Sequence, residues 1–272
     1  MKRYFLPILL GTVLLWGCAS KEETLMKEGR ALLDAGEYVQ AVNCFDHALE
    51  VHGNGRIRAL ELDILKYRAE AEFKAGDYHA AGHTYDILIS AEGRKSNYLY
   101  MQAIIHARMA EDDAIAQIEE AQRYLQEADK GDAKMERLAA MEIAKAYEAV
   151  YENKPEEQYL TQAEEILNGV IRERGQKEPQ SLGLLGNIRF KRQDYAGAKE
   201  AFEEALALFN ERNTTKLGES LLKDLRFSQA VCYEYLQDYP KALELFNDYV
   251  VRFGEDEKAA HEIAFLQSRI HP

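Results

Sequence analysis

The sequence predicts an all-α protein built as an array of helical hairpins, and three observations lead to this prediction. The 272 residues include only five prolines, and Ala, Leu, Glu, Lys, Gln and Arg dominate the composition; these residues lose the least free energy on entering a helix. Apolar residues recur three and four positions apart, as on one face of a helix. One such apolar frame recurs six times at intervals of 33 to 49 residues, a length typical of a helical hairpin.

The chain begins with a segment, residues 1–17, that has the features of a secretory signal. Lys2 and Arg3 precede an apolar run at positions 4–15. This run is shorter than the about 20 apolar residues that a membrane-spanning helix needs. A short basic start followed by such a run is typical of a signal peptide that is removed from the mature protein.

The end of this segment, Leu-Trp-Gly-Cys at positions 15–18, resembles the lipobox of bacterial lipoproteins. That motif has leucine and two small residues before the cysteine, so Trp16 departs from it. The resemblance implies that Cys18 becomes the first residue of the mature chain and carries a lipid anchor, which holds the folded part outside the cytoplasm. Ala19 in place of aspartate implies the outer membrane, or the outer face of the cytoplasmic membrane in an organism with one membrane. A cleaved but unlipidated signal and a retained anchor remain alternatives.

The linker between the lipid and the folded part is expected to be very short, at residues 18–21. Ser20 and Glu23 have the spacing of a capping box, which places the start of the first helix directly after Ser20. A domain held so close to the membrane favours a partner that is itself membrane-associated.

The charge of the chain limits its partners. The formal net charge is −13, and it becomes −15 when Lys2 and Arg3 leave with the signal. Such an excess of negative charge repels phosphate backbones and anionic lipid, and no basic stripe is present in the sequence. We therefore expect no nucleic-acid binding, and membrane attachment only through the lipid.

The repeated frame consists of an alanine, a large apolar residue four positions later and a further apolar residue three positions after that. In four copies a Gly or Gln, an acidic residue and a tyrosine precede the alanine, whereas the third and fourth copies lack the tyrosine. The six copies are Ala41/Phe45/Ala48, Ala81/Tyr85/Leu88, Ala114/Ile118/Ala121, Ala163/Leu167/Val170, Ala198/Phe202/Ala205 and Ala242/Phe246/Tyr249.

The frame resembles the tetratricopeptide repeat, whose pattern W-x2-L-G-x2-Y…A-x3-F…P describes two antiparallel helices. Residues 182–205 show the likeness best, with Leu182, Leu185 and Gly186 ahead of the alanine. The tryptophan and the final proline are absent, and most periods exceed 34 residues. The resemblance implies a right-handed superhelical solenoid of about six hairpins over residues 22–255, in which the two central hairpins are degenerate.

Short-range signals support the second helix of several hairpins. Asp77, Asp194 and Asp238 are placed to cap these helices, and Pro240 falls in a first turn, where its missing N–H costs nothing. At the end of the chain, residues 256–272 are expected to form an amphipathic capping helix that closes the array. Its expected inner side consists of Ala260, Ile263, Ala264 and Leu266.

The sequence offers little support for chemistry. His79 and His83 share one helix face, but the glutamate of the H-E-x-x-H metalloprotease motif is absent and both residues lie off the apolar face. The run at 111–113 is expected to be a solvated helix face. Cys44 and Cys232 lie far apart within helical patterns, so no disulfide framework is implied. We therefore expect no metal, no cofactor and no enzymatic activity.

The family resemblance implies a binding groove formed by the first helices of successive hairpins. Its residues lie 15, 11, 8 and 7 positions before the marker alanine of each copy. The candidates are Met26, Arg30 and Asp34 in the first copy, Lys66, Glu70, Phe73 and Lys74 in the second, Asn187, Phe190 and Lys191 in the fifth, and Phe227, Val231, Glu234 and Tyr235 in the sixth.

The four aromatic candidates are expected to act either as apolar anchors for a ligand or as core residues, and the sequence leaves these alternatives open. A lysine–asparagine clamp, with which some family members grip a C-terminal carboxylate, is not reproduced, because Gly183 stands where Asn187 would need its lysine.

Three functions follow as hypotheses. The first is a membrane-anchored, extracytoplasmic scaffold or adaptor that binds a protein or peptide segment in the groove. The alternative is a dedicated subunit of a cell-envelope machine, of the kind that assembles outer-membrane proteins or pili. The third is a metal- or small-ligand-binding protein, which would require a bound ion at His79 and His83.

Overall fold

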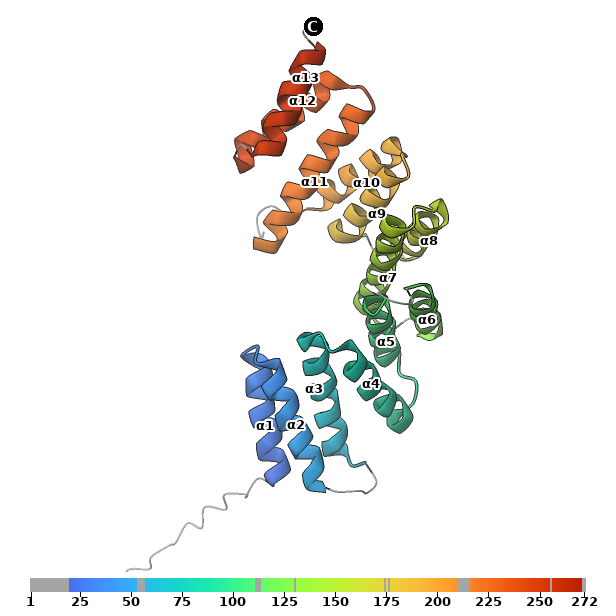
Figure 1. Cartoon of the computed structure of the whole chain (residues 1–272), viewed down its shortest axis with the longest axis vertical. Coiled ribbons are helices and arrows are strands. Elements are labelled where there is room, and N and C mark those ends of the chain that lie inside the picture. The colour runs from blue at the N-terminus through green and yellow to red at the C-terminus, as the bar shows by residue number, and fades with distance from the viewer. Residues whose placement is uncertain are drawn as a thin grey trace, which may run out of the picture. The chain divides into compact units, whose positions relative to one another are not determined.

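The computed structural model describes residues 20–52, 57–110, 114–129, 131–173, 175, 177–209, 216–254 and 256–270. The predicted signal, Cys18 and the acidic run at 111–113 lie outside the described residues. In the described part the chain forms α-helices and one short π-helical segment, with no strand, so the predicted all-α class is confirmed. The helices (Figure 1) are α1 (Lys21–Asp34), α2 (Tyr38–His52), α3 (Ala59–Ala75), α4 (Tyr78–Glu92), α5 (Ser96–Arg108), α6 (Ala114–Glu127), α7 (Ala133–Asn153), α8 (Glu157–Asn168), the π-helical η1 (Gly169–Glu173), α9 (Pro179–Lys191), α10 (Tyr195–Leu208), α11 (Lys216–Tyr235), α12 (Tyr239–Phe253) and α13 (Glu257–Ile270).

The chain divides into two compact units between Asp77 and Tyr78. Unit 1 contains α1 to α3, and unit 2 contains α4 to α13. The border therefore runs between α3 and α4, the two helices that the sequence assigns to the second hairpin. No helix in the described residues is both long enough and apolar enough to cross a membrane.

Unit 1 is a three-helix core in which α2 packs against both α1 and α3. Phe45 of α2 is fully buried and stacks on Tyr67 of α3, with ring centroids 6.1 Å apart. The marker residues Ala41 and Ala48 are also fully buried in this core. The capping box at its start is present: the Glu23 amide donates to Ser20 Oγ at 3.1 Å, and the Ser20 amide donates to the Glu23 carboxylate at 3.3 Å.

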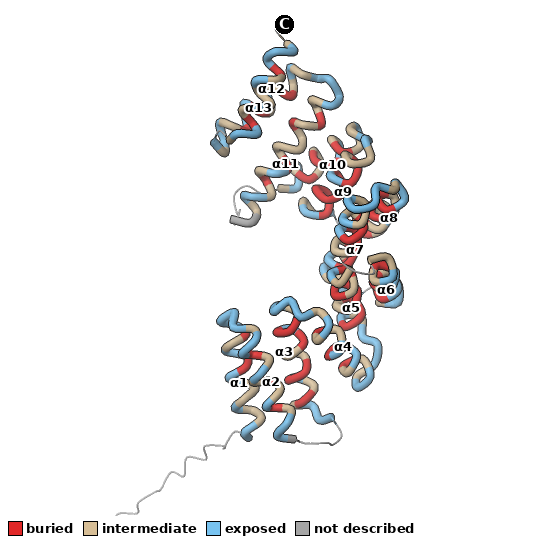
Figure 2. The backbone as a smooth tube through the Cα atoms, in the orientation of Figure 1, coloured by how far each residue is buried: buried red, intermediate tan, exposed pale blue. Residues whose placement is uncertain are grey.

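Unit 2 continues the hairpin pattern with the pairs α5–α6, α7–α8, α9–α10 and α11–α12, each packed against the next. Buried and exposed stretches alternate along these helices (Figure 2). The marker positions of the frame are buried in every copy within this unit except Ala114, which is half-buried. The frame therefore marks the second helix of these four hairpins correctly, including the two copies that lack the tyrosine.

In four copies the residue before the acidic residue of the turn has a positive φ. This left-handed conformation is the same whether that residue is glycine or glutamine. Gly36 and Gly76 have φ of 83°, and Gln193 and Gln237 have φ of 63° and 64°. The aspartate that follows each glutamine then caps the next helix, as predicted: Asp194 accepts from the Gly197 amide at 2.9 Å, and Asp238 accepts from the Lys241 amide at 3.3 Å. The predicted place of Pro240 in the first turn of α12 is also confirmed.

The last helix, α13, packs on α12 and closes the array. Leu266 is fully buried there, together with Ala259, which the sequence pattern missed. The predicted inner side is wrong at one position, because Ala264 is exposed, while Ala260 and Ile263 are half-buried. The buried seam is set by the angle at which α13 crosses its neighbour, and a helical period alone does not contain that angle.

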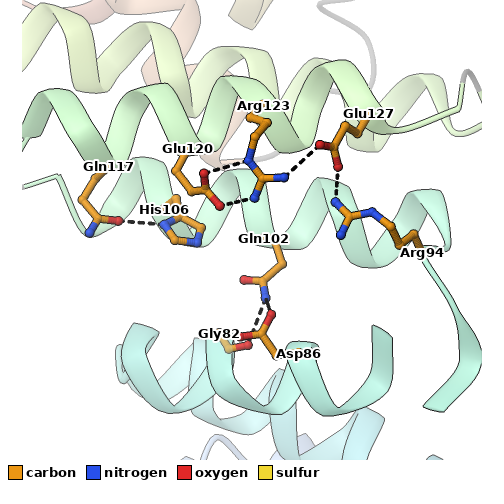
Figure 3. Close-up of polar contacts among 9 residues, drawn as sticks. All are labelled: Gly82, Asp86, Arg94, Gln102, His106, Gln117, Glu120, Arg123 and Glu127. Carbon is orange, nitrogen blue, oxygen red and sulfur yellow. Dashed lines mark hydrogen bonds and ion pairs between the residues drawn. The ribbon is translucent and has the colours of Figure 1, made fainter. Parts of the chain in front are cut away.

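Polar side chains fix the packing around the degenerate third hairpin (Figure 3). Gln102 of α5 is 1% exposed, and its amide nitrogen donates to the Gly82 carbonyl at 3.0 Å and to Asp86 at 2.7 Å. His106 Nδ1 of α5 lies 2.7 Å from Gln117 Oε1 of α6, and this hydrogen bond connects the two helices. These hydrogen bonds link α4, α5 and α6. The third copy of the frame, at α6, lacks the tyrosine that precedes the alanine in four other copies.

An ion-pair chain continues along α6 in the same view (Figure 3). Arg123 binds Glu120 and Glu127, and Glu127 also binds Arg94. Tyr124 lies under Arg123, whose guanidinium carbon is 4.6 Å from the ring centroid. The hydrogen bond and charge of Arg123 lower the pKa of Glu120. We attribute a structural role to this chain of ion pairs.

Candidate functional site

A cavity of about 310 Å³ opens between the first helices of three successive hairpins in unit 2. The frame places these helices side by side because each second helix packs between two first helices. The residues that line the cavity come from α7, α9, α10 and α11: Glu148, Asn187, Phe190, Lys191, Phe202, Phe227, Ser228 and Val231.

A second hollow of about 760 Å³ adjoins the first and shares Asn187, Phe227 and Ser228 with it. It follows α11 toward the connection between α12 and α13. We call the two hollows together the groove. The further residues of the second hollow are Ser220, Lys223, Asp224, Tyr249, Asp256, Glu257 and Lys258.

The centre of the groove is apolar. Phe227 meets Phe246 and Tyr249 edge to face, with ring centroids 5.3 and 5.6 Å apart. Phe202 and Phe246 are fixed because they are almost fully buried, whereas Phe227 is half-buried and presents part of its ring to the cavity. The two alternatives for Phe227 therefore both apply: one part of its ring belongs to the core and another part lines the groove.

An aromatic rim borders the cavity at Phe190. The ring of Phe190 lies 5.1 Å from that of Tyr195 and 5.0 Å from that of Tyr235, and the two tyrosine rings are 4.7 Å apart. Tyr235 is 52% exposed. Rings held against one another in this way offer a rigid apolar surface that loses little side-chain entropy when a ligand covers it.

Lys191 is held at one end of the cavity by two carboxylates of α7. Its Nζ lies 2.8 Å from Glu148 and 2.6 Å from Glu152. Partial burial lowers the pKa of Lys191, but the hydrogen bonds and charges of the two glutamates exceed this effect and raise the pKa overall. The lysine hydrogen bond and charge lower the pKa of Glu152. Lys191 and Glu152 are therefore both charged at neutral pH.

Lys223 and Asp256 form a second ion pair at the other end, 3.1 Å apart. Asp256 also accepts from the Ala259 amide at 3.0 Å and from the Tyr249 hydroxyl at 2.8 Å. The backbone bond, the tyrosine and the lysine together lower the pKa of Asp256 to about 2. Asp256 is thus both the cap of α13 and a fixed negative charge in the groove.

Two segments of the chain match models of the tetratricopeptide repeat, at residues 26–97 and 179–212. Within these segments, α1 packs against α2 and α9 packs against α10 as helical hairpins. The fold is of the tetratricopeptide-repeat class. The second segment contains α9 and α10, and so supplies the middle of the groove.

Solved structures support the same fold. The chain is similar to the pilF protein of Pseudomonas aeruginosa, with 13% identity, a TM-score of 0.56, and coverage of 91% of this chain and 97% of that one. A tetratricopeptide repeat protein from Parabacteroides merdae has 14% identity, a TM-score of 0.53, and coverage of 90% and 84%. The assembly chaperone of RpL4 has 16% identity, a TM-score of 0.52, and coverage of 92% and 96%. At these identities the likeness concerns the fold alone. No curated protein sequence matches.

Five of the predicted groove residues come together in the tetratricopeptide fold. They come from the fifth and sixth copies and line the same cavity: Asn187, Phe190, Lys191, Phe227 and Val231. Tyr235 lies beside them through its contact with Phe190. Glu234 has a different neighbour, because it lies against Glu262 of α13. Burial, the Glu262 charge and a hydrogen bond to Glu262 raise the pKa of Glu234 to about 7.

The other candidates belong to unit 1, whereas the groove forms within unit 2. Among the residues of α3, Lys66 pairs with Asp63 at 3.3 Å, Lys74 pairs with Glu70 at 2.7 Å, and Phe73 is half-buried. On α1, Met26 is half-buried, Asp34 is exposed, and the Arg30 guanidinium lies over the Tyr67 ring at 4.7 Å.

The missing clamp lysine has a packing explanation. A Cβ atom at Gly183 would lie 2.9 Å from the Leu225 side chain of α11. Gly183 is buried where α9 and α11 approach each other, so a lysine there would push the two helices apart. The groove of this chain is thus built without the carboxylate clamp.

Sequence reasoning missed the two carboxylates that hold Lys191, although a signal for them exists. Glu148 and Glu152 lie 15 and 11 positions before Ala163, the same offsets that locate the groove in the other copies. The fourth copy lacks the tyrosine that precedes the alanine in the more complete copies. By contrast, Tyr249 and Asp256 enter the groove through packing between hairpins, and no repeat offset predicts them.

The histidines and cysteines that could bind a metal or take part in redox chemistry do not line the groove. His79 and His83 are exposed on α4. No group of three histidine, cysteine or acidic side chains within the described ranges could hold a metal ion. Cys44 is half-buried and Cys232 is buried, and both are free thiols. Burial raises the pKa of Cys232 to about 12, which makes this thiol a poor nucleophile.

Proposed function

We propose that this protein is a non-catalytic scaffold that binds an extended or helical segment of a partner protein in the groove. The cavity that Phe190, Phe227 and Val231 line, with the aromatic rim beside it, carries the proposal. Partly exposed aromatic side chains in a pocket are typical of the residues that dominate protein interfaces. The tetratricopeptide fold supports the same function, because its repeats place such a surface on successive first helices.

A photo-crosslinking amino acid in place of Asn187 tests the proposal. Asn187 is exposed and lines both hollows, whereas Asn247 is exposed on α12 and lines neither of them. We expect crosslinking in native envelopes to join Asn187, but not Asn247, to one protein. Mass spectrometry then identifies the joined segment.

The captured segment, made as a synthetic peptide, should bind the purified protein. Binding should weaken by about tenfold or more in Val231→Asp, because the buried charge is left unpaired in the apolar centre. Equal capture at both asparagines, or a peptide that binds Val231→Asp as well as the wild type, would refute the groove as the binding site.

We further propose that the protein is a lipid-anchored extracytoplasmic protein attached through Cys18. The apolar segment at 4–15 and the lipobox-like end support this proposal. Cells fed a clickable fatty acid should label the wild-type protein and leave Cys18→Ser unlabelled. Separation of the membranes by density should then place the labelled protein in one membrane, with its folded part accessible to protease from outside the cytoplasm. Labelling of Cys18→Ser equal to that of the wild type would contradict the anchor.

A further inference from the structure

The groove combines an apolar centre with negatively charged ends. The cavity volume of about 310 Å³ is roughly ten times the about 30 Å³ that one water occupies in the liquid. Phe190, Phe227 and Val231 offer this space to a bulky apolar side chain. The charges around the cavity then decide which partner segments can place such a side chain in it.

Carboxylates outnumber lysines around the groove by five to three. Two of the lysines, Lys191 and Lys223, are already neutralised by ion pairs within the chain. The unbalanced charge is therefore negative. The groups counted are Glu148, Glu152, Asp224, Asp256 and Glu257 against Lys191, Lys223 and Lys258.

The C-terminal ends of three helices meet at the rim. Lys191, the last residue of α9, contacts Glu152 in the last turn of α7. Phe190 contacts Tyr235, the last residue of α11. The C-terminal end of a helix carries partial negative charge and favours a cation. Tyrosine ring faces, such as the half-exposed face of Tyr235, also attract a cation.

These features agree with the charge of the whole chain. A formal charge of −13 attracts basic partners at long range and repels acidic ones. The groove and the whole molecule both carry net negative charge, so both favour a positively charged partner over a negatively charged one.

From this, and resting on the proposed function, we infer that the groove selects a partner segment in which lysine or arginine residues flank a bulky apolar side chain. The apolar side chain fills the cavity between Phe190, Phe227 and Val231. A flanking basic side chain bonds the carboxylates of Glu148 and Glu152 at the rim. Lys191 occupies the same carboxylates in the free protein and competes with the partner for them.

Three synthetic peptides of twelve residues provide the probe. Each has a central tryptophan and a fluorescent label, and the flanking residues are lysine-rich, serine-rich or glutamate-rich. Fluorescence anisotropy measures their binding to the full chain purified in detergent. We expect the lysine-rich peptide to bind about tenfold more tightly than the glutamate-rich one, with the serine-rich peptide between them.

Charge variants with matched controls locate the effect. Glu152 is 63% exposed beside Lys191, and Glu244 is 59% exposed in an ion pair with Lys241 on α12, outside the groove. Glu152→Lys should weaken the lysine-rich peptide about threefold to tenfold, with little change for the serine-rich peptide. Glu244→Lys should leave all three affinities unchanged.

Removal of the Lys191 charge should raise the affinity for the lysine-rich peptide. Lys191→Met frees Glu148 and Glu152, so the lysine-rich peptide should bind more tightly. Lys241→Met should have no effect. The preference should also decrease as added salt shortens the Debye length from about 10 Å at 0.1 M to about 3 Å at 1 M.

Each outcome separates this inference from the proposed function. If the serine-rich or glutamate-rich peptide binds as tightly as the lysine-rich one, or if Glu152→Lys and Glu244→Lys behave alike, the charge selection is wrong while the groove still binds protein. If no peptide binds, the inference is also overturned. The crosslinking at Asn187 then decides by itself whether a partner occupies the groove.

Discussion

At the scale of single residues, two glycines show how the hairpins reach their close packing. An added Cβ would lie 2.6 Å from the Phe45 ring at Gly29 and 2.6 Å from the Phe202 ring at Gly186. In each case a first helix crosses the phenylalanine of its own second helix at a position with no room for a side chain. The glycine lowers helix propensity locally, and the tight contact with a buried ring offsets that loss.

Gly186→Ala should therefore destabilise the protein despite the better helix propensity of alanine. Overpacking against a fixed ring costs about 1–3 kcal/mol, and the propensity gain offsets about 1 kcal/mol of it. The shift of the urea unfolding midpoint measures the net loss. Gly169→Ala is the matched control, because a Cβ there meets nothing within 4 Å; it should be neutral or slightly stabilising. A similar shift in both variants would disprove the steric explanation.

Glu234 should make stability depend on pH in an unusual direction. Its folded-state pKa of about 7 lies above the ordinary value of 4.5, because of burial and the charge of Glu262. Between pH 4.5 and 7 the folded state holds the proton that the unfolded state releases, so stability falls as pH rises through this window and stays lower above it. Below pH 4.5 both states are protonated and the penalty is absent.

The melting temperature of the wild type at about pH 5.5 and about pH 8 tests this expectation. Glu234→Gln should melt higher than the wild type at pH 8 and should show a smaller difference between the two pH values. Glu262→Gln should act in the same direction, because it removes the charge that faces Glu234. If both variants keep the wild-type pH dependence, the carboxyl pair is not its source.

At the scale of elements, the six-copy frame locates a helix at each copy, including α6 and α8. Within the packed pairs α1–α2, α5–α6, α7–α8, α9–α10 and α11–α12, the large apolar residue of the frame is buried. The frame does not predict which contacts fix a degenerate hairpin against the helix that precedes it. At α4 and α5 a buried glutamine, Gln102, supplies hydrogen bonds to the preceding helix, and a single sequence gives no periodic signal for such a contact.

The terminal helix should stabilise mainly its own neighbours. Leu266 of α13 is fully buried against the cluster that includes Ala230, Ala242 and Phe246. Leu266→Ala removes about 2–5 kcal/mol of local stability. In repeat proteins this loss is confined largely to adjacent repeats. Hydrogen exchange should therefore accelerate in α12 and α13 and stay unchanged in α7 and α8. Faster exchange throughout unit 2 would contradict this local model.

At the scale of the whole molecule, the negative charge predicts which partners are excluded. The chain should not bind duplex DNA even at about 50 mM salt, where phosphate contacts are screened least. Anisotropy of a labelled 20-base-pair duplex titrated with the protein measures this directly. Saturable, salt-sensitive binding would show that a local basic surface outweighs the formal charge of −13.

The sequence by itself determined the all-α class, the helix at each copy of the frame and the caps at Ser20, Asp194 and Asp238. These features depend on neighbours within a few residues, so a single chain contains their signals. The resemblance to the tetratricopeptide repeat located five groove residues, because equivalent positions in stacked hairpins face the same side.

Only the tertiary structure decided the division at Asp77, the inner face of α13 and the charged ends of the groove. The inner face of α13 and the charged ends of the groove depend on how whole helices pack against one another, and a helical period alone does not contain the packing angle. Asp256 illustrates the difference. Its place beside Ala259 follows from local capping, but its pairing with Lys223 and Tyr249 arises because α11, α12 and α13 pack together.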